Sequence, residues 1–375
     1  MSPHLPASSP GSPSTRISTP TSHNPSVGLL ASRASTSGPA KSDPAPALAS
    51  GSVSLPAPWC LENGATLEEA SLGFELCGPA EAPVIVVLGG ISASAHVTAT
   101  DRQPEGGWWP DLTGPGRAID TDRFRVLGID FLGGPNTAYI PRLDGRPAQT
   151  SIPTTGDQAR ALAHLLTHLG IDSIHTFLGS SYGGMVALAF AAEFPERVEQ
   201  LVILSAAHHS HPRSTAWRSL QRKIVELARS TGNERQGLVL ARGLAMTTYR
   251  SPEELQERFD APPRSTSSGF RFPIDDYLEA RGQAFADSFD GAAFLRLSES
   301  IDLHRVDPRE IETPATLVAV RQDQLVPVEQ LRQLHEELGG PCRLLEIDSL
   351  YGHDAFLKEI DALDAILCGC LGEEV

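Results

Sequence analysis

A Gly-x-Ser-x-Gly pattern at residues 179–183 contains the first candidate for catalysis, Ser181. Residues 174–178 before it are β-prone, and residues 184–192 after it are rich in helix formers. A strand, a sharp turn and a helix would leave the Ser181 hydroxyl exposed at the strand tip, above the helix N-terminus. We therefore interpret Ser181 as a nucleophile. The alternative is a glycine-rich turn whose serine only caps the helix.

A serine nucleophile needs a base that takes its proton and an acid that orients this base. Asp323 follows an apolar segment at 315–320, and His353 follows another at 343–347. The chain order Ser, acid, His fits a nucleophile on a strand–turn–helix elbow. We predict Asp323 as the acid and His353 as the base. The alternative for Asp323 is a cap for the turn before a helix near Pro327.

Acyl transfer also requires hydrogen-bond donors aimed at the developing oxyanion. We predict the backbone N–H groups of Tyr182, directly after the nucleophile, and of Ile91, in the glycine-containing loop at 89–92. Paired glycines in that loop allow a close approach of the main chain, although an ordinary strand-to-loop turn has the same composition. These residues predict a serine acyl-enzyme and leave the acceptor open.

The elements that must position these residues alternate along the chain from Leu72 onward. Strands are predicted at 83–88, 124–130, 174–178, 200–205, 315–320 and 343–347, with helices at 155–169 and after the nucleophile. This alternation predicts an α/β fold whose mostly parallel sheet is covered by helices on both faces, with ligands at the carboxyl ends of the strands. Residues 53–375 would form this domain, with a helical lid at approximately 211–300, where no strand is evident.

Residues 1–52 differ from the rest of the chain, because they are dense in Ser, Pro, Thr and Ala and have no acidic residue before Asp43. Such a segment buries too little apolar surface to offset its ordering entropy, so we expect a disordered tail. The alternative is an organelle transit peptide, although Arg16 and Arg33 are its only arginines.

Composition excludes several classes of partner. A net charge of −16 gives no reason to expect nucleic acid or an anionic membrane surface. No apolar run reaches the ~18 residues that span a bilayer. Five scattered cysteines favour reduced thiols in the cytoplasm. Neither Cys-Gly-Cys at 368–370 nor His-His-Ser-His at 208–211 has a matching ligand set, so we expect no metal site.

Several segments resemble those of homoserine O-acyltransferases of the α/β-hydrolase superfamily. They are residues 106–109, 114–123, 183–185, 242–251 and 352–357, which span most of the chain from 89 to 357. The resemblance implies the α/β-hydrolase fold, and it implies Ser181, Asp323 and His353 as the catalytic residues. It further implies Arg242 and Asp354 as homoserine contacts, with Tyr249 nearby.

The same resemblance implies L-homoserine and an acyl-CoA as substrates, no bound cofactor, a role in methionine biosynthesis, a homodimer and a cytoplasmic location. Segments 181–190 and 242–249 look like a branch that uses succinyl-CoA. Leu325, where many succinyl-using relatives carry arginine, is a departure from that pattern. We therefore favour succinyl-CoA only slightly over acetyl-CoA.

The chemistry of homoserine agrees with these assignments, because a zwitterion needs one cation and one anion in its site. Arg242 can bind a carboxylate through two parallel hydrogen bonds, and Asp354 can hold the ammonium. The alternatives are a solvated helix charge for Arg242 and the N-cap of the last helix for Asp354. Rival functions are a serine O-acyltransferase of the same family, and an esterase or thioesterase, which has no need of the zwitterion contacts.

Overall fold

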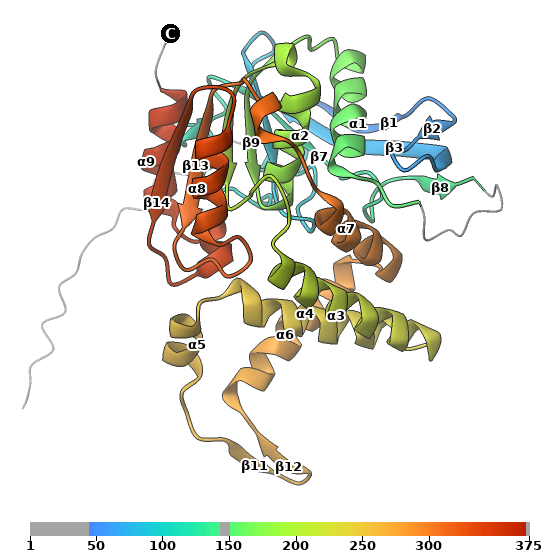
Figure 1. The fold of residues 1–375 in the computed structure, drawn as a ribbon, viewed down its shortest axis with the longest axis vertical. Helices are drawn as coiled ribbons and strands as arrows, with labels where there is room; N and C mark the ends of the chain where they lie inside the picture. Colours follow the sequence, from blue (N-terminus) through green and yellow to red (C-terminus); the bar gives the residue numbers. More distant parts are fainter. Residues whose placement is uncertain (1–44, 143–150, 373–375) are drawn as a thin grey trace, which may run out of the picture. The chain divides into compact units, whose positions relative to one another are not determined.

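The computed structural model describes residues 45–142 and 151–372, and within them a sheet of ten strands forms the centre of the fold. The main path through the sheet is β1 (Ala47–Ser54), β3 (Thr66–Cys77), β7 (Arg125–Ile129), β4 (Val84–Leu88), β9 (Ile174–Ser180), β10 (Val198–Leu204), β13 (Ala315–Val320) and β14 (Cys342–Ile347). Two short strands, β2 (Trp59–Cys60) and β8 (Tyr139–Pro141), pair with β3 beside this path. The strands from β7 to β14 are parallel, whereas β1 and β3 are antiparallel at one edge (Figure 1). The mostly parallel sheet predicted from the sequence is confirmed.

The helices of the core follow the strands. They are α1 (Thr155–His168), α2 (Tyr182–Glu193), α8 (Val328–Glu337) and α9 (Ile360–Leu371), with the 3₁₀ helices η2 (Pro195–Arg197), η3 (Pro308–Glu310) and η4 (Gly352–Leu357). α1 begins where the sequence predicts, because Thr154 and Asp157 cap it reciprocally. The N–H of Asp157 donates to Thr154 Oγ1 over 3.1 Å, and the N–H of Thr154 donates to the Asp157 carboxylate over 2.8 Å.

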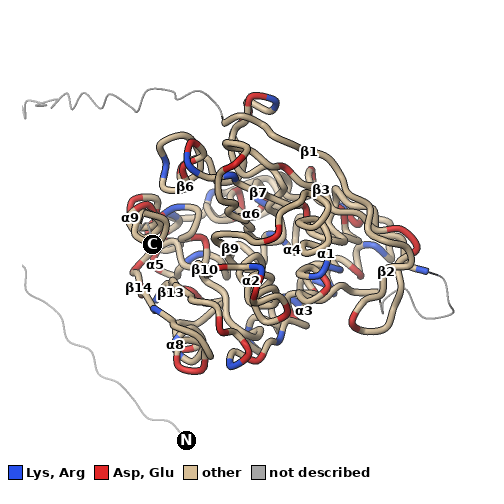
Figure 2. The backbone as a smooth tube through the Cα atoms, turned by 90° about the horizontal axis from the view of Figure 1, so that it is seen from above, with Lys and Arg blue, Asp and Glu red and all other residues tan. Residues whose placement is uncertain are grey.

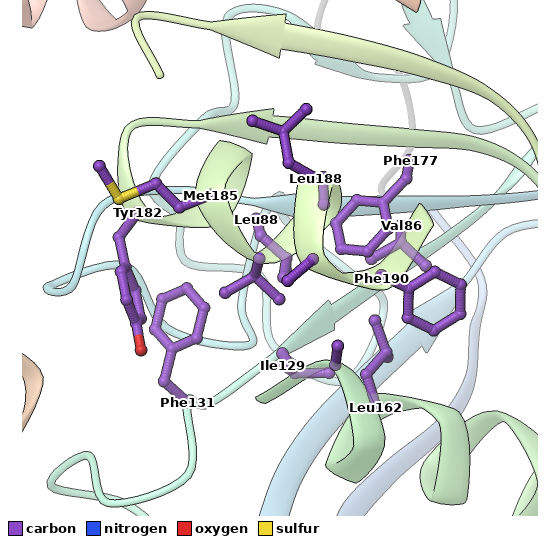
Figure 3. Packing of buried hydrophobic residues seen from close by; sticks show 14 of the residues in the cluster. Val86, Leu88, Ile129, Phe131, Leu162, Phe177, Tyr182, Met185, Leu188 and Phe190 are labelled. Atoms are coloured by element: carbon purple, nitrogen blue, oxygen red, sulfur yellow. The ribbon is translucent and has the colours of Figure 1, made fainter. Parts of the chain in front are cut away.

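The continuous apolar run of β4 reflects burial on both faces of the sheet. Successive side chains of a strand point to opposite faces. Val86 and Leu88 therefore join one apolar cluster with α1 and α2, while Ile85 and Val87 join a second cluster with α9. Figure 3 shows the first cluster, with Phe190 of α2 among its aromatic side chains. Two helical layers thus enclose the strand that leads into the 89–92 loop.

A long insertion lies between β10 and β13. It consists of α3 (Pro212–Ser230), α4 (Glu234–Tyr249), α5 (Pro252–Phe259), the hairpin β11 (Arg264–Thr266) and β12 (Gly269–Arg271), α6 (Pro273–Ser288) and α7 (Gly291–Leu303). The sequence predicts helices and no strand in this insertion, so the β11–β12 hairpin differs from the prediction. Its strands have three residues each and are largely exposed, which leaves no apolar alternation to detect. Within the insertion, α4 contacts η4, the segment that carries His353.

The expected tail of residues 1–52 extends too far into the chain. Ala47–Ser54 forms β1 and pairs with β3, so the prediction is wrong for this part. The hydrogen bonds between β1 and β3 are made by the main chain, and Val53 is the buried residue of β1. The other residues of β1 are mostly Ala, Ser and Gly, so its sequence has no apolar alternation that would predict a strand. Residues 1–44, the remainder of the expected tail, lie outside the described residues.

Charged residues are spread over the fold. Figure 2 shows acidic and basic positions interspersed along the backbone, and the whole sequence carries a net charge of −16. None of the helices in the described ranges is long and apolar enough to cross a membrane. With this distribution, an anionic ligand must be held by individual cations inside a site rather than attracted by a basic surface.

Candidate active site

Ser181 occupies the sharp turn between β9 and α2. Its backbone has φ 53° and ψ −120°, a conformation that non-glycine residues rarely adopt and that is costly without support from the surrounding structure. The neighbouring glycines permit the turn: a Cβ on Gly179 would lie 2.4 Å from the carbonyl oxygen of Gly183, and one on Gly183 would lie 2.3 Å from that of Leu88. The Ser181 side chain makes no capping hydrogen bond to α2, so the simple capping role is wrong.

His353 lies between Ser181 and Asp323. Its Nε2 is 2.9 Å from Ser181 Oγ, and its Nδ1 is 2.7 Å from Asp323 Oδ2. Because an ionised carboxylate only accepts hydrogen bonds, Nδ1 carries the proton and Nε2 is left to accept from the serine hydroxyl. The three residues that the sequence assigns to catalysis are thus brought together in the geometry of a hydrogen-bonded relay.

Asp323 has two structural tasks at once. Its Oδ2 accepts from His353, while its Oδ1 accepts from the N–H groups of Leu325 and Val326 over 2.8 and 3.0 Å. The turn cap considered as an alternative is therefore present, and it fixes the carboxylate that orients the histidine. The Asp323 side chain is fully buried, which shields the pair from water.

Burial and charge act in opposite directions on His353. Burial lowers the pKa of this buried imidazole, but the charge and hydrogen bond of Asp323 outweigh that effect and leave the pKa above 6.5. The imidazolium that forms when His353 takes the serine proton is therefore stabilised in place.

The two main-chain groups predicted to bind an oxyanion belong to segments that touch. Tyr182 is the first residue of α2, so an α-helix provides no acceptor for its N–H. The N–H of Gly183 donates to the carbonyl of Gly89 over 2.9 Å, which holds the 89–92 loop against the elbow, and Ile91 of this loop lines the pocket beside Ser181. The Tyr182 side chain points away into the core against Phe131 (Figure 3).

The larger of two pockets at Ser181 contains both predicted acceptor contacts. It has a volume of about 170 Å³ and is lined by Ser181, Tyr249, Arg242 and Asp354 among others. The Arg242 guanidinium lies 5.1 Å from the ring centres of both Tyr249 and Phe285. Among the residues that the structure describes, Arg242 has no carboxylate within ion-pair distance. It is therefore a half-buried cation facing a pocket, and the solvated helix charge is wrong.

Asp354 is buried and paired with Arg250. Asp354 Oδ2 lies 3.2 Å from Nη2 of Arg250. Nη1 of the same arginine lies 3.3 Å from the carboxylate of the buried Glu254. Burial raises the pKa of Asp354, and the charges of Arg250 and Arg242 oppose that effect. Asp354 is part of η4, whereas α9 has Glu359 at its N-cap, so the capping alternative for Asp354 is wrong.

A smaller pocket lies against the other side of Ser181. It has a volume of about 40 Å³ and shares Ser181, Tyr249, Ile301 and His353 with the first. Its own lining includes Arg218 and Gln221 of α3, and also Leu325, the position noted as a departure in the sequence. Sequence reasoning assigned α3 only to the lid. The spacing of three residues between Arg218 and Gln221, which places both on one helix face, is the signal that was missed.

The histidine segment at 208–211 lies beside the smaller pocket. Within residues 45–142 and 151–372, no group of three His, Cys, Asp or Glu side chains is placed to hold a metal ion. His209 and His211 instead line the smaller pocket. Burial lowers the pKa of His209, which favours its neutral form.

Comparisons with known proteins match this geometry. A family model described as the alpha/beta hydrolase fold matches residues 83–360. A homoserine O-succinyltransferase of Xanthomonas campestris pv. campestris is 46% identical over 303 residues, which cover 81% of this chain and 79% of the relative. The chain belongs to the homoserine O-acyltransferase family of α/β-hydrolases.

Two further proteins named as O-acyltransferases have lower sequence identity to this chain. A serine O-succinyltransferase of Litchfieldella anticariensis is 34% identical, with 82% of this chain and 94% of the relative covered. The crystal structure of homoserine O-acetyltransferase from Bacillus anthracis superposes with a TM-score of 0.77 at 20% identity, over 87% of this chain and 98% of the other. At that identity the superposition shows the fold alone, and it confirms the fold class predicted from the sequence.

Proposed function

We propose that this protein is a homoserine O-acyltransferase, which transfers an acyl group from acyl-CoA to the hydroxyl of L-homoserine through Ser181. The observation that carries the proposal is the pocket beside Ser181. There Arg242, a guanidinium that has no carboxylate partner within residues 45–142 and 151–372, stands with a buried carboxylate, Asp354. This pair complements the two charges of an amino acid. The name of the 46% identical relative supports homoserine as acceptor and favours succinyl-CoA over acetyl-CoA as donor.

The first half-reaction loads the enzyme. Ser181 Oγ attacks the thioester carbonyl while His353 Nε2 takes its proton, and the N–H groups of Tyr182 and Ile91 stabilise the oxyanion. The C–S bond then breaks, and His353 returns the proton to the departing sulfur, which leaves as the thiol of CoA. The product is an ester on Ser181. No bound cofactor or metal is needed for these steps, and acyl-CoA is a co-substrate.

The second half-reaction transfers the acyl group. Arg242 holds the carboxylate and Asp354 the ammonium of L-homoserine, with Tyr249 beside them, so that the hydroxyl faces the ester. His353 takes the hydroxyl proton as the oxygen attacks the acyl carbon. The bond to Ser181 Oγ then breaks, and His353 returns the proton to the serine. Positioning of the acceptor supplies much of the advantage of homoserine over water.

Two other functions use the same catalytic residues. Serine is the second candidate acceptor. It has the same zwitterionic group as homoserine and one methylene less, and the 34% identical relative is named a serine O-succinyltransferase. A serine esterase or thioesterase uses water, for which neither Arg242 nor Asp354 is required. The zwitterion contacts therefore favour an amino-acid acceptor over water.

The remaining proposals concern assembly and setting. Leu220, Leu227 and Leu240 on the packed helices α3 and α4 are 53%, 70% and 54% exposed, which supports a homodimer that covers this surface. The five cysteines form no disulfide, in keeping with a cytoplasmic enzyme. An O-acylated homoserine would be an intermediate of methionine biosynthesis. Light scattering after gel filtration tests the dimer, and Leu227→Asp should shift it toward the monomer.

A thiol-release assay tests the function. Succinyl-CoA or acetyl-CoA is supplied with L-homoserine, L-serine or no acceptor, and free CoA is followed with time. We expect a burst of CoA equal to the enzyme concentration without acceptor, and sustained release when homoserine is present. Equal steady-state release with and without amino acid would identify a thioesterase instead. Faster turnover with serine than with homoserine would identify a serine O-acyltransferase.

A further inference from the structure

The two pockets at Ser181 divide the site into separate compartments. They share one wall, made by Ser181, Tyr249, Ile301 and His353. The larger compartment contains Arg242 of α4, and the smaller contains Arg218 of α3, two helices that lie side by side (Figure 1). An ester on Ser181 can therefore extend into the smaller compartment while an acceptor occupies the larger one.

The residues around the smaller compartment carry an excess of positive charge. Asp302 is shared by two arginines, with 2.7 Å ion pairs to Arg218 Nη2 and to Arg222 Nη1. Arg222 Nη1 also donates to the main-chain oxygen of Ser298 over 3.0 Å, so this guanidinium is held away from the pocket by its own contacts. One carboxylate balances one guanidinium, and of the two arginines only Arg218 lines the pocket. The unbalanced charge is thus presented beside Ser181.

Arg218 retains capacity for another ligand. Its Nε donates to Asp302 Oδ1 over 2.8 Å, and its Nη2 donates to Ser210 Oγ. Within the described part of the chain, Nη1 has no hydrogen-bond partner, and the side chain keeps 12% of its surface exposed. The charge of Arg218 is felt at the catalytic base, where it acts to lower the pKa of His353 against the larger effect of Asp323. This guanidinium is therefore near the reacting groups.

The proposed function creates a need for two cations. When a succinylated Ser181 meets homoserine, the site must hold two carboxylates at once, one on the acyl chain and one on the amino acid. Arg242 can neutralise one of them through two parallel hydrogen bonds. Each of the two pockets, as the described residues form them, contains one arginine, so the second carboxylate matches Arg218.

The size of the smaller pocket agrees with a short acyl chain. A water-sized group needs about 10–15 Å³ of such a cavity, so 40 Å³ holds about three groups. Beyond its acyl carbon, a succinyl group has two methylenes and one carboxylate. The single methyl of an acetyl group would leave most of this space without contacts.

We propose that Arg218 is the donor-specificity residue of this enzyme and that the smaller pocket binds the distal carboxylate of a four-carbon dicarboxylic acyl group. This inference rests on the proposed function and deepens it. The acyl chain is held on the α3 side of Ser181, whereas the amino acid is held on the α4 side.

The test compares three donors in the first half-reaction. The burst of CoA is measured without acceptor for succinyl-CoA, for butyryl-CoA, which has the same chain length without the carboxylate, and for acetyl-CoA. Wild-type enzyme should prefer succinyl-CoA to butyryl-CoA. Arg218→Met should lower the ratio of their acylation rates at subsaturating donor by about 10- to 100-fold, the range expected for a lost charge-assisted hydrogen bond. Arg218→Lys should restore part of the preference.

Arg222→Met is the matched control, because it removes the other guanidinium of Asp302 on the same helix without removing a residue that lines the pocket. Its donor ratio should stay within about threefold of wild type, and thermal melts of both variants report their folding. An equal loss with all three donors in Arg218→Met would overturn the proposal and assign Arg218 a structural role. An unchanged succinyl preference in Arg218→Met, or an equal change of ratio in Arg222→Met, would also overturn it.

The two proposals fail in different ways. If homoserine never accelerates turnover, the proposed function is wrong, yet the burst still reports whether Arg218 selects the donor. If homoserine accelerates turnover but Arg218→Met keeps the wild-type donor ratio, the acyltransferase stands and the assignment of Arg218 is wrong.

Discussion

Two charge clusters flank Ser181, and they are built in opposite ways. On the α4 side, one buried guanidinium, Arg250, lies between the carboxylates of Glu254 and Asp354. On the α3 side, one carboxylate, Asp302, lies between the guanidinium groups of Arg218 and Arg222. With Arg258, which also pairs with Glu254, the first cluster is balanced in charge, whereas the second has a surplus of positive charge.

The difference lies in which member of each cluster is left facing the site. Glu254 has a second partner in the partly exposed Arg258 at 2.9 Å, which leaves Arg250 to neutralise Asp354, the carboxylate of this cluster that lines the larger pocket. On the α3 side, Arg222 donates to the main-chain oxygen of Ser298, so the unmatched positive charge falls on Arg218. Buried ions are costly unless they are paired. The α4 side therefore presents an ion-paired carboxylate to its pocket, and the α3 side presents a guanidinium that shares its carboxylate with a second arginine.

Removing the nucleophile between the clusters should have the largest effect. Ser181→Ala should lower turnover by about 10⁴-fold or more, because covalent catalysis is lost while both charge clusters remain. Stopped-flow and steady-state CoA release measure this, with a thermal melt to verify folding. Activity above a tenth of wild type would mean that another group is acylated and that the two clusters do not flank the reacting atom.

Arg242→Ala separates the two sides kinetically. The acyl-CoA burst should persist, while kcat/KM for homoserine should fall by the equivalent of about 2–4 kcal/mol, because charge-assisted bonds to the acceptor carboxylate are lost. Arg242→Lys should recover only part, since an ammonium lacks the planar two-bond geometry. Loss of the succinyl burst together with a relative gain for acetyl-CoA would instead place the acyl carboxylate on Arg242 and reverse the assignment of the two sides.

Arg250→Met tests the cluster on the α4 side through stability. Two buried carboxylates would lose their shared cation, so the free energy of unfolding should fall by about 3 kcal/mol. Arg258→Met is the control: it pairs with the same Glu254 but is 42% exposed, and it should cost less than about 1 kcal/mol. Urea unfolding followed by circular dichroism measures both. Equal losses in the two variants would show that Arg250 is no more important to Asp354 than a surface charge.

A smaller effect is expected in the pH dependence. Acylation requires neutral His353, and its pKa is raised, so the acid limb of kcat/KM for acyl-CoA should have its midpoint above 6.5. The stability that His353 contributes has the same origin: it is present below the unfolded-state pKa and is lost as pH rises through the folded-state pKa. In Asp323→Asn the burial of His353 is opposed only by the weaker effect of Asp354, so the limb of the residual activity should move to lower pH. A limb that stays in place would show that Asp323 does not control the base.

The sequence predicts the parts of this fold in which local pattern and burial agree. The apolar runs of β4 and β13 and the capped start of α1 were found because every residue in them favours the element it forms. The candidate triad could be predicted because chain order and strand–turn context are local signals. β1 was missed because an edge strand of small residues depends on main-chain pairing with β3 rather than on its own side chains.

The positive cluster could not be predicted from the sequence. Asp302 and Arg218 lie 84 positions apart in the chain, and only the packing of α7 against α3 brings them together. On α3 the helical spacing places Arg218 on the face that carries the buried Ser214 and Gln221, but it does not indicate what that face packs against. Arg242 was found because the family resemblance pointed to it, whereas the spacing of Arg218 and Gln221 indicates a shared helix face and not the pocket that this face lines.

The common wall between the two pockets has a consequence for how this site can diversify. Arg218 and Gln221 of α3 touch one compartment and Arg242 of α4 the other, so a change at one of these positions alters one specificity with little effect on the other. Tyr249 and Ile301 touch both compartments. A substitution there must suit two ligands at once, which makes these two positions the slowest to vary when a lineage exchanges either its donor or its acceptor.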